Sequence, residues 1–256
     1  MLAATRSAVR PGATGPTPTP GPQVRDLASP AAGFTVEWDV RSIYDFLFSL
    51  TGDAGATDDL PETDRAWLRE TKAALDPEIV ADIDRLFAAQ LCIFLAALVV
   101  EHPELATVDD LLALLEAVPT HELVATVLRD VAHDPELAPL VERASAGDAQ
   151  AREALRAATS GHKDDLYALL DDPAGTHRRL VRVLTAWAVP FAAIEPRIRA
   201  IQSRDASLRA PDRGAYAGSE LIERTTGGIR WLPEVGIRRV ILAPSYFSRP
   251  YNYLLA

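Results

Sequence analysis

Residues 227–256, GGIRWLPEVGIRRVILAPSYFSRPYNYLLA, differ from the rest of the chain and decide its expected fold. The segment combines β-branched and aromatic residues with prolines that end short apolar runs, a pattern typical of strands. We expect strands at 229–232, 238–243 and 251–255, joined in a small antiparallel sheet. Residues 35–40, TVEWDV, alternate polar and apolar side chains, which predicts a further short strand.

The residues between these two segments are expected to form one helix after another. Apolar residues at helical spacing, together with capping residues and prolines at helix starts, predict helices at 42–50, 61–75, 77–101, 108–118, 119–132, 135–146, 148–159, 163–170, 176–203 and 219–226. The helix 77–101 is the central one, because it is apolar nearly all round after Leu86. Pro190 and Pro196 should kink or break the helix 176–203. The predicted fold class is mainly α with a small antiparallel β-sheet (α+β).

Local signals refine the helix boundaries. Ser42 and Asp45 have the spacing of a capping box, as do Thr107 and Asp110. Three sequences of the type Asp/His-Pro-Glu, at 76–78, 102–104 and 134–136, are predicted to begin helices, because proline is tolerated at the first helical position. Residues 205–218 are expected to form a polar loop. Gly227 and Gly228 are expected to end the last helix in a left-handed cap.

The chain is expected to contain one folded domain. Residues 1–33 are rich in Pro, Thr, Ala and Gly and have no apolar period, so they are predicted to be a disordered tail. Residues 34–256 are predicted to be a single helical domain, with its β segment at about 229–256. A length of 256 residues is compatible with one large domain.

Composition excludes several classes of protein. The net charge is −10, which argues against a broad positively charged surface that would bind nucleic acid or anionic lipid. With Cys92 as the single cysteine and no secretory signal, a reducing cytoplasm is the expected location. The most apolar run, 86–100, contains Gln90 and is shorter than the roughly 20 residues that a membrane span needs.

Catalytic and metal-binding patterns are not found in the sequence. The five histidines are far apart and form no helical pair, so we predict no metal site. There is no Gly-x-Ser-x-Gly elbow and no phosphate-binding loop. Paired acids fall at predicted helix boundaries, and Cys92 lies inside an apolar helix. We therefore expect no catalytic residues, no cofactor and no enzymatic activity.

One group of residues in the tail is a candidate binding surface. The candidate ligand-binding residues are Trp231, Arg238, Tyr246, Phe247, Arg249 and Tyr251. Aromatic side chains beside arginines can bind an anionic or aromatic ligand. The alternative, which we favour, is an ordinary sheet whose aromatic residues pack inward while its arginines face outward.

Two segments resemble a known family. TVEWDV at 35–40 and IRWLPEVGIRRVILAPSYFSRPYNYLL at 229–255 resemble the N-terminal domain of bacterial ArsR-like winged-helix transcription regulators. The resemblance covers residues 35–256 and implies a helical domain followed by a winged helix-turn-helix. No helix-turn-helix with a basic recognition helix is found in residues 1–256, so DNA contacts are expected only through a missing C-terminal domain. The family's thiolate metal site does not transfer, since Cys92 is the single thiol.

The function expected from this resemblance is regulatory. We expect a ligand-sensing or dimerisation domain of an ArsR-like regulator that lacks its DNA-binding domain. The alternative is a stand-alone small-molecule-binding protein without catalysis. The expected partners are an unknown small-molecule effector and a second copy of the chain in a homodimer, with no membrane.

Overall fold

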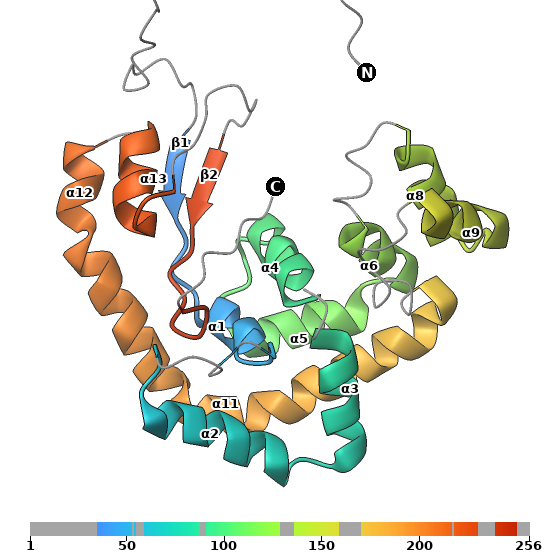
Figure 1. Cartoon of the computed structure of the whole chain (residues 1–256), viewed down its shortest axis with the longest axis horizontal. Helices are drawn as coiled ribbons and strands as arrows, with labels where there is room; N and C mark the ends of the chain where they lie inside the picture. Colours follow the sequence, from blue (N-terminus) through green and yellow to red (C-terminus); the bar gives the residue numbers. More distant parts are fainter. Residues whose placement is uncertain are drawn as a thin grey trace, which may run out of the picture.

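The computed structural model describes residues 35–52, 54, 59–87, 91–128, 136–158, 170–216, 218–229 and 239–249. Most of them are helical. The helices are α1 (Ser42–Phe48), α2 (Glu62–Ala74), α3 (Pro77–Phe87), α4 (Leu91–Glu101), α5 (Val108–Ala117), α6 (Thr120–Val127), α8 (Ala138–Ser145), α9 (Ala149–Ala158), α11 (Pro173–Leu208), α12 (Ala210–Ala215) and α13 (Gly218–Thr226). Two strands, β1 (Thr35–Trp38) and β2 (Arg239–Leu242), lie beside α13 (Figure 1).

The longest helix, α11, packs against α1, α3, α5, α6 and α12 and organises the fold. Its 36 residues run through Pro190 and Pro196 without a break, so of the expected kink or break the break is not found. Figure 1 shows that the axis of α11 turns in its C-terminal half and rises toward α12, which is the behaviour of a helix that prolines kink. The buried side of α11 consists mainly of Leu180, Val183, Leu184, Trp187, Phe191 and Ile198.

The expected central helix 77–101 is two helices, α3 and α4, whose axes differ by 77°. A straight helix of that length would extend about 37 Å, whereas the bend brings α4 beside α1 and α6. There α4 is buried nearly all round, as its composition predicts. Among the described residues, no single helix has the length and hydropathy of a membrane span, and only α3 and α4 taken together across their bend do.

The sheet is parallel, which corrects the predicted antiparallel arrangement. Thr35 pairs with Arg239 and Trp38 with Leu242, and the whole helical domain forms the crossover between the two strands. The prediction assumed that neighbouring segments of the tail pair as hairpins. Instead β2 pairs with β1, a strand about two hundred residues earlier in the chain. A connection of that length is long enough for the two strands to run parallel. Residues 230–232 and 251–255, where two further strands were expected, lie outside the described residues.

Several helix boundaries also differ from the expected ones. Residues 102–105 form a turn after α4 rather than a helix start, and the expected polar loop at 205–218 contains the end of α11 and all of α12. The capping box of Thr107 and Asp110 is confirmed. The capping box expected at Ser42 is wrong, because Arg41 is the N-cap residue of α1. The side chain of Asp45 accepts hydrogen bonds from Tyr246 and Phe247 instead of capping the helix. The expected helix at 163–170 lies outside the described residues, apart from Leu170.

The glycine cap after α13 is confirmed. Gly227 has φ of +74°, a conformation that glycine adopts without a Cβ penalty. The N–H of Gly228 donates to the carbonyl of Glu223 at 2.9 Å, which is the longer bond of a Schellman motif. This cap directs the chain away from α13 at the edge of the cavity described below.

Candidate functional site

A buried carboxylate, Asp45 on α1, fixes the turn that follows β2. Its Oδ1 accepts hydrogen bonds from the Ser245 hydroxyl at 2.7 Å and from the backbone N–H groups of Tyr246 and Phe247 at 2.6 and 2.8 Å. Its Oδ2 accepts a bond of 2.7 Å from the amide of Gln202 on α11. Asp45 is 0% exposed, so these donors replace the water that it loses on folding.

Burial is the largest influence on the pKa of the Asp45 carboxyl group. Loss of water around the Asp45 carboxylate raises its pKa from 3.8 to about 6, although the bonds from Phe247, Ser245, Tyr246 and Gln202 act in the opposite direction. The sequence placed Asp45 in a helix cap, where an acid would be solvated. Its actual donors come from residues about two hundred positions later in the chain.

A second acid, Asp64 on α2, holds the side chain of the same turn. Its carboxylate accepts hydrogen bonds from the Tyr246 hydroxyl and from the guanidinium of Arg197. Although burial acts to raise the pKa of Asp64, the bonds from Arg197 and Tyr246 hold it below its ordinary value. Phe247, 2% exposed, stacks on Trp67 with ring centroids 6.1 Å apart. Tyr246 and Phe247 are therefore anchors of the turn.

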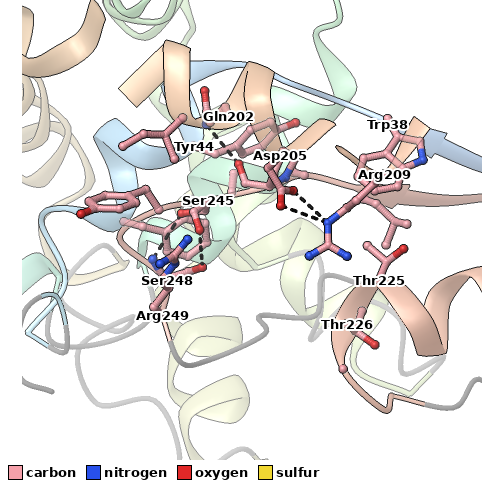
Figure 2. Close-up of a pocket in the computed structure, with 18 of the residues that line it drawn as sticks. Trp38, Tyr44, Gln202, Asp205, Arg209, Thr225, Thr226, Ser245, Ser248 and Arg249 are labelled. Carbon is pink, nitrogen blue, oxygen red and sulfur yellow. Dashed lines mark hydrogen bonds and ion pairs between the residues drawn. The ribbon is translucent and has the colours of Figure 1, made fainter. Parts of the chain in front are cut away.

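The turn forms one wall of a cavity of about 500 Å³ (Figure 2). The other walls come from the end of the sheet, from α1 and α4, from the C-terminal end of α11 and from α13. The apolar part of the lining consists mainly of Phe48, Ala96, Val100, Ile201 and Leu242. Because these walls come from both ends of the chain, the cavity exists only in the folded domain.

The polar part of the lining is dominated by guanidinium groups. Arg209, Arg224 and Arg249 line the cavity, and Asp205 is the single acid among its lining residues. The Nε of Arg209 donates to both oxygens of Asp205 at 3.1 and 3.0 Å. Figure 2 shows the two terminal nitrogens of Arg209 directed away from Asp205, into the space between the turn and Thr225.

The other two arginines lie over aromatic rings. The guanidinium of Arg224 lies 4.2 Å from the ring centroid of Tyr216 and 3.7 Å from the carboxylate of Asp212. The guanidinium of Arg249 lies 5.2 Å from the ring centroid of Tyr246. Such stacking positions a cation without neutralising it, so Arg249 contributes its positive charge to the cavity, whereas the charge of Arg224 is partly compensated by Asp212.

Among the described residues, two polar atoms of the lining are buried without a hydrogen-bond partner. They are the indole Nε1 of Trp38 and the hydroxyl of Thr225. Buried polar groups are nearly always paired in native proteins, so unpaired ones require an explanation. Both belong to the end of the cavity that β1 and α13 form.

The structure places half of the sequence-predicted site residues. Tyr246 and Arg249 line the cavity, whereas Phe247 packs in the core against Trp67. Trp231, Arg238 and Tyr251 lie outside the described residues. Sequence reasoning missed the helical part of the lining, above all Gln202, Asp205, Arg209 and Arg224. The available signal was the Asp205/Arg209 pair at helical i,i+4 spacing, in a segment that was read as a loop.

The described residues contain no group of three or more His, Cys, Asp or Glu side chains that would hold a metal ion. Comparisons with protein-family models, with curated proteins and with solved structures find no match to this chain. The cavity and the residues of the turn are therefore the features from which a function can be inferred.

Proposed function

We propose that this chain is a non-catalytic regulatory domain that binds a small organic molecule in the cavity between the turn, α11 and α13. The observation that carries this proposal is the cavity itself. Its volume of about 500 Å³ lies within the range of small-molecule sites, and its lining combines an apolar side with a few convergent polar groups.

The construction of the turn supports a sensing role. Ser245 and Tyr246 line the cavity, and the same two residues bind the buried carboxylates of Asp45 and Asp64. Gln202 also lines the cavity and bonds both to Asp45 and to the carbonyl of Pro244. A ligand that contacts these side chains would therefore act on the hydrogen bonds that dock the turn.

The assignment to a transcription regulator is based on the resemblance of residues 35–40 and 229–255 to ArsR-like proteins. In this proposal DNA is contacted by a winged helix-turn-helix domain outside residues 1–256, and the protein works in the cytoplasm. The net charge of −10 supports the view that residues 1–256 do not themselves grip DNA. Homodimer formation stays a prediction.

A ligand screen with a blocked cavity tests the proposal. Thermal unfolding is measured with a library of small organic metabolites, for the wild type and for Ala243→Trp, which fills the cavity mouth. A ligand at about 100 times its Kd should raise the Tm of the wild type by about 5 °C and leave Ala243→Trp unchanged. Ala200→Trp, at an exposed position of α11 outside the lining, is the control and should respond like the wild type.

The alternative is a stand-alone binding protein that uses the same cavity. The two proposals differ in what the ligand does in the cell. For a regulatory domain, deletion of the gene changes the transcriptional response to the ligand. For a stand-alone binding protein, that response is the same with and without the gene. A screen in which no ligand separates the wild type from Ala243→Trp would refute both.

A further inference from the structure

We infer that the ligand of this cavity is an amphipathic organic anion, whose acidic group binds Arg209 and whose apolar body packs against α4 and β2. This inference rests on the proposed function and specifies its ligand class. It is derived from the charge of the lining, the direction of Arg209 and the position of the apolar side.

The charge of the lining is opposite to that of the chain. The protein carries a net charge of −10, yet the cavity contains three arginines and one acid. A cavity with walls of low dielectric strengthens the field of the charges that line it. An anion is therefore attracted to this part of a protein whose surface otherwise repels it.

Arg209 is arranged as an anion receptor. Its Nε is held by Asp205, one helical turn earlier, so the planar guanidinium has a fixed orientation. The terminal nitrogens have no hydrogen-bond partner within the described part of the chain and are directed into the cavity (Figure 2). This paired edge matches the two oxygens of a carboxylate or phosphate group, which arginine binds in a bidentate manner.

The apolar side of the cavity excludes a simple inorganic anion as the best ligand. Ala96 and Val100 belong to α4 and Leu242 to β2, and all three line the same cavity as Arg209. An inorganic phosphate would leave these side chains in contact with water. A ligand with an aliphatic or aromatic body would cover them and gain the free energy of apolar burial.

Matched probes test the charge requirement. Binding of 1-naphthylacetate, 1-naphthyl phosphate, 1-naphthylacetamide and 1-naphthylmethylamine is measured by titration calorimetry on the full chain. The inference predicts that at least one of the two anions binds about tenfold or more tightly than the neutral amide, and that the amine binds most weakly. The acetate and the phosphate distinguish the two sources of acidic group.

Arg209→Met tests the assigned residue. This variant removes the charge and keeps an apolar side chain, and the loss of a half-buried i,i+4 ion pair at the end of α11 should leave the fold intact. We expect the affinity for the tighter anion to fall about tenfold or more, with the affinity for the amide unchanged. Arg199→Met, at an exposed position of the same helix outside the lining, should bind all four probes like the wild type.

The outcomes separate this inference from the proposed function. If the amide or the amine binds as tightly as the anions, and Ala243→Trp abolishes that binding, the cavity is a ligand site and the anion inference is wrong. Equal loss of anion binding in Arg209→Met and Arg199→Met would also overturn it, since the effect would then be one of net charge. If no probe binds the wild type even at millimolar concentration, the anion inference is overturned, whereas the proposed function is refuted only by failure of the metabolite screen with Ala243→Trp.

Discussion

The two halves of α11 are held by different kinds of contact. The N-terminal half packs Leu180, Val183 and Leu184 into the apolar core, and a fully buried side-chain hydrogen bond there joins two neutral groups, the Trp187 indole and the Ser49 hydroxyl. The C-terminal half carries a buried polar residue, Gln202, which is 2% exposed and bonds to the buried carboxylate of Asp45. In Figure 1 the first half lies beside α3 and α5, and the second rises toward the strands.

This difference concerns specificity as much as stability. Apolar contacts are not directional, so the N-terminal half of α11 tolerates small shifts against its neighbours. A buried carboxylate requires donors at fixed positions, because an unpaired one is costly. Asp45 therefore allows one placement of the turn 245–247 against α1 and α11. That placement forms the cavity wall, so the polar half of the interface is the half that shapes the proposed ligand site.

The largest expected effect comes from removing that carboxylate. Asp45→Ala leaves three donors of the turn, the Ser245 hydroxyl and the N–H groups of Tyr246 and Phe247, without their acceptor. We expect the free energy of unfolding to fall by about 3 kcal/mol or more, measured by urea denaturation. The matched change in the other half, Thr120→Ala, removes a hydrogen bond to His177 and should cost about 1 kcal/mol. Equal losses in the two variants would contradict the comparison.

A smaller effect is expected from pH. The pKa of Asp45 is about 6 in the folded protein and 3.8 in the unfolded reference, so between these values the folded state binds more protons. Its contribution to stability is therefore fully present below about pH 4 and is lost as the pH rises through about 6, by roughly 2 to 3 kcal/mol. Asp45→Asn cannot titrate, so the difference in stability between the wild type and this variant should change over that interval.

Urea denaturation of both proteins at several pH values between 4 and 7 measures this difference. Other acids cancel in the comparison, including Asp64, whose pKa is lowered and whose own contribution has the opposite slope. A constant difference across the interval would show that Asp45 does not titrate there, and hence that its four donors outweigh its burial.

The helical half of the fold was predictable because its signals are local. The capping box of Thr107 and Asp110 is complete within four residues, and the glycine cap after α13 within six. Helices α2 and α9 were predicted to within about one residue at each end, because cap, apolar period and stop all lie in the helix or next to it.

The cavity was not predictable for the opposite reason. Asp45 has the spacing of a local cap, and only its long-range donors show that it is a buried anchor. The direction of the sheet depends on the pairing of β1 with β2, which no local pattern encodes. The bend between α3 and α4 is likewise a requirement of packing, since the apolar sequence of 77–101 fits one helix as well as two.

The smallest of the expected effects concerns the second anchor of the turn. Tyr246→Phe removes the hydroxyl that donates to Asp64 and keeps the ring, whose edge packs against Phe247 with centroids 5.3 Å apart. Asp64 retains its bond from Arg197, so no charge is left unpaired. We expect the free energy of unfolding to fall by about 1 kcal/mol, measured by urea denaturation. Tyr216→Phe, at a half-buried position whose hydroxyl has no hydrogen-bond partner among the described residues, should leave stability unchanged. Because Tyr246 also lines the cavity, ligand affinity in Tyr246→Phe is informative as well. Weaker binding at unchanged stability would mean that the hydroxyl contacts the ligand, whereas lower stability with unchanged affinity would confine its role to docking the turn.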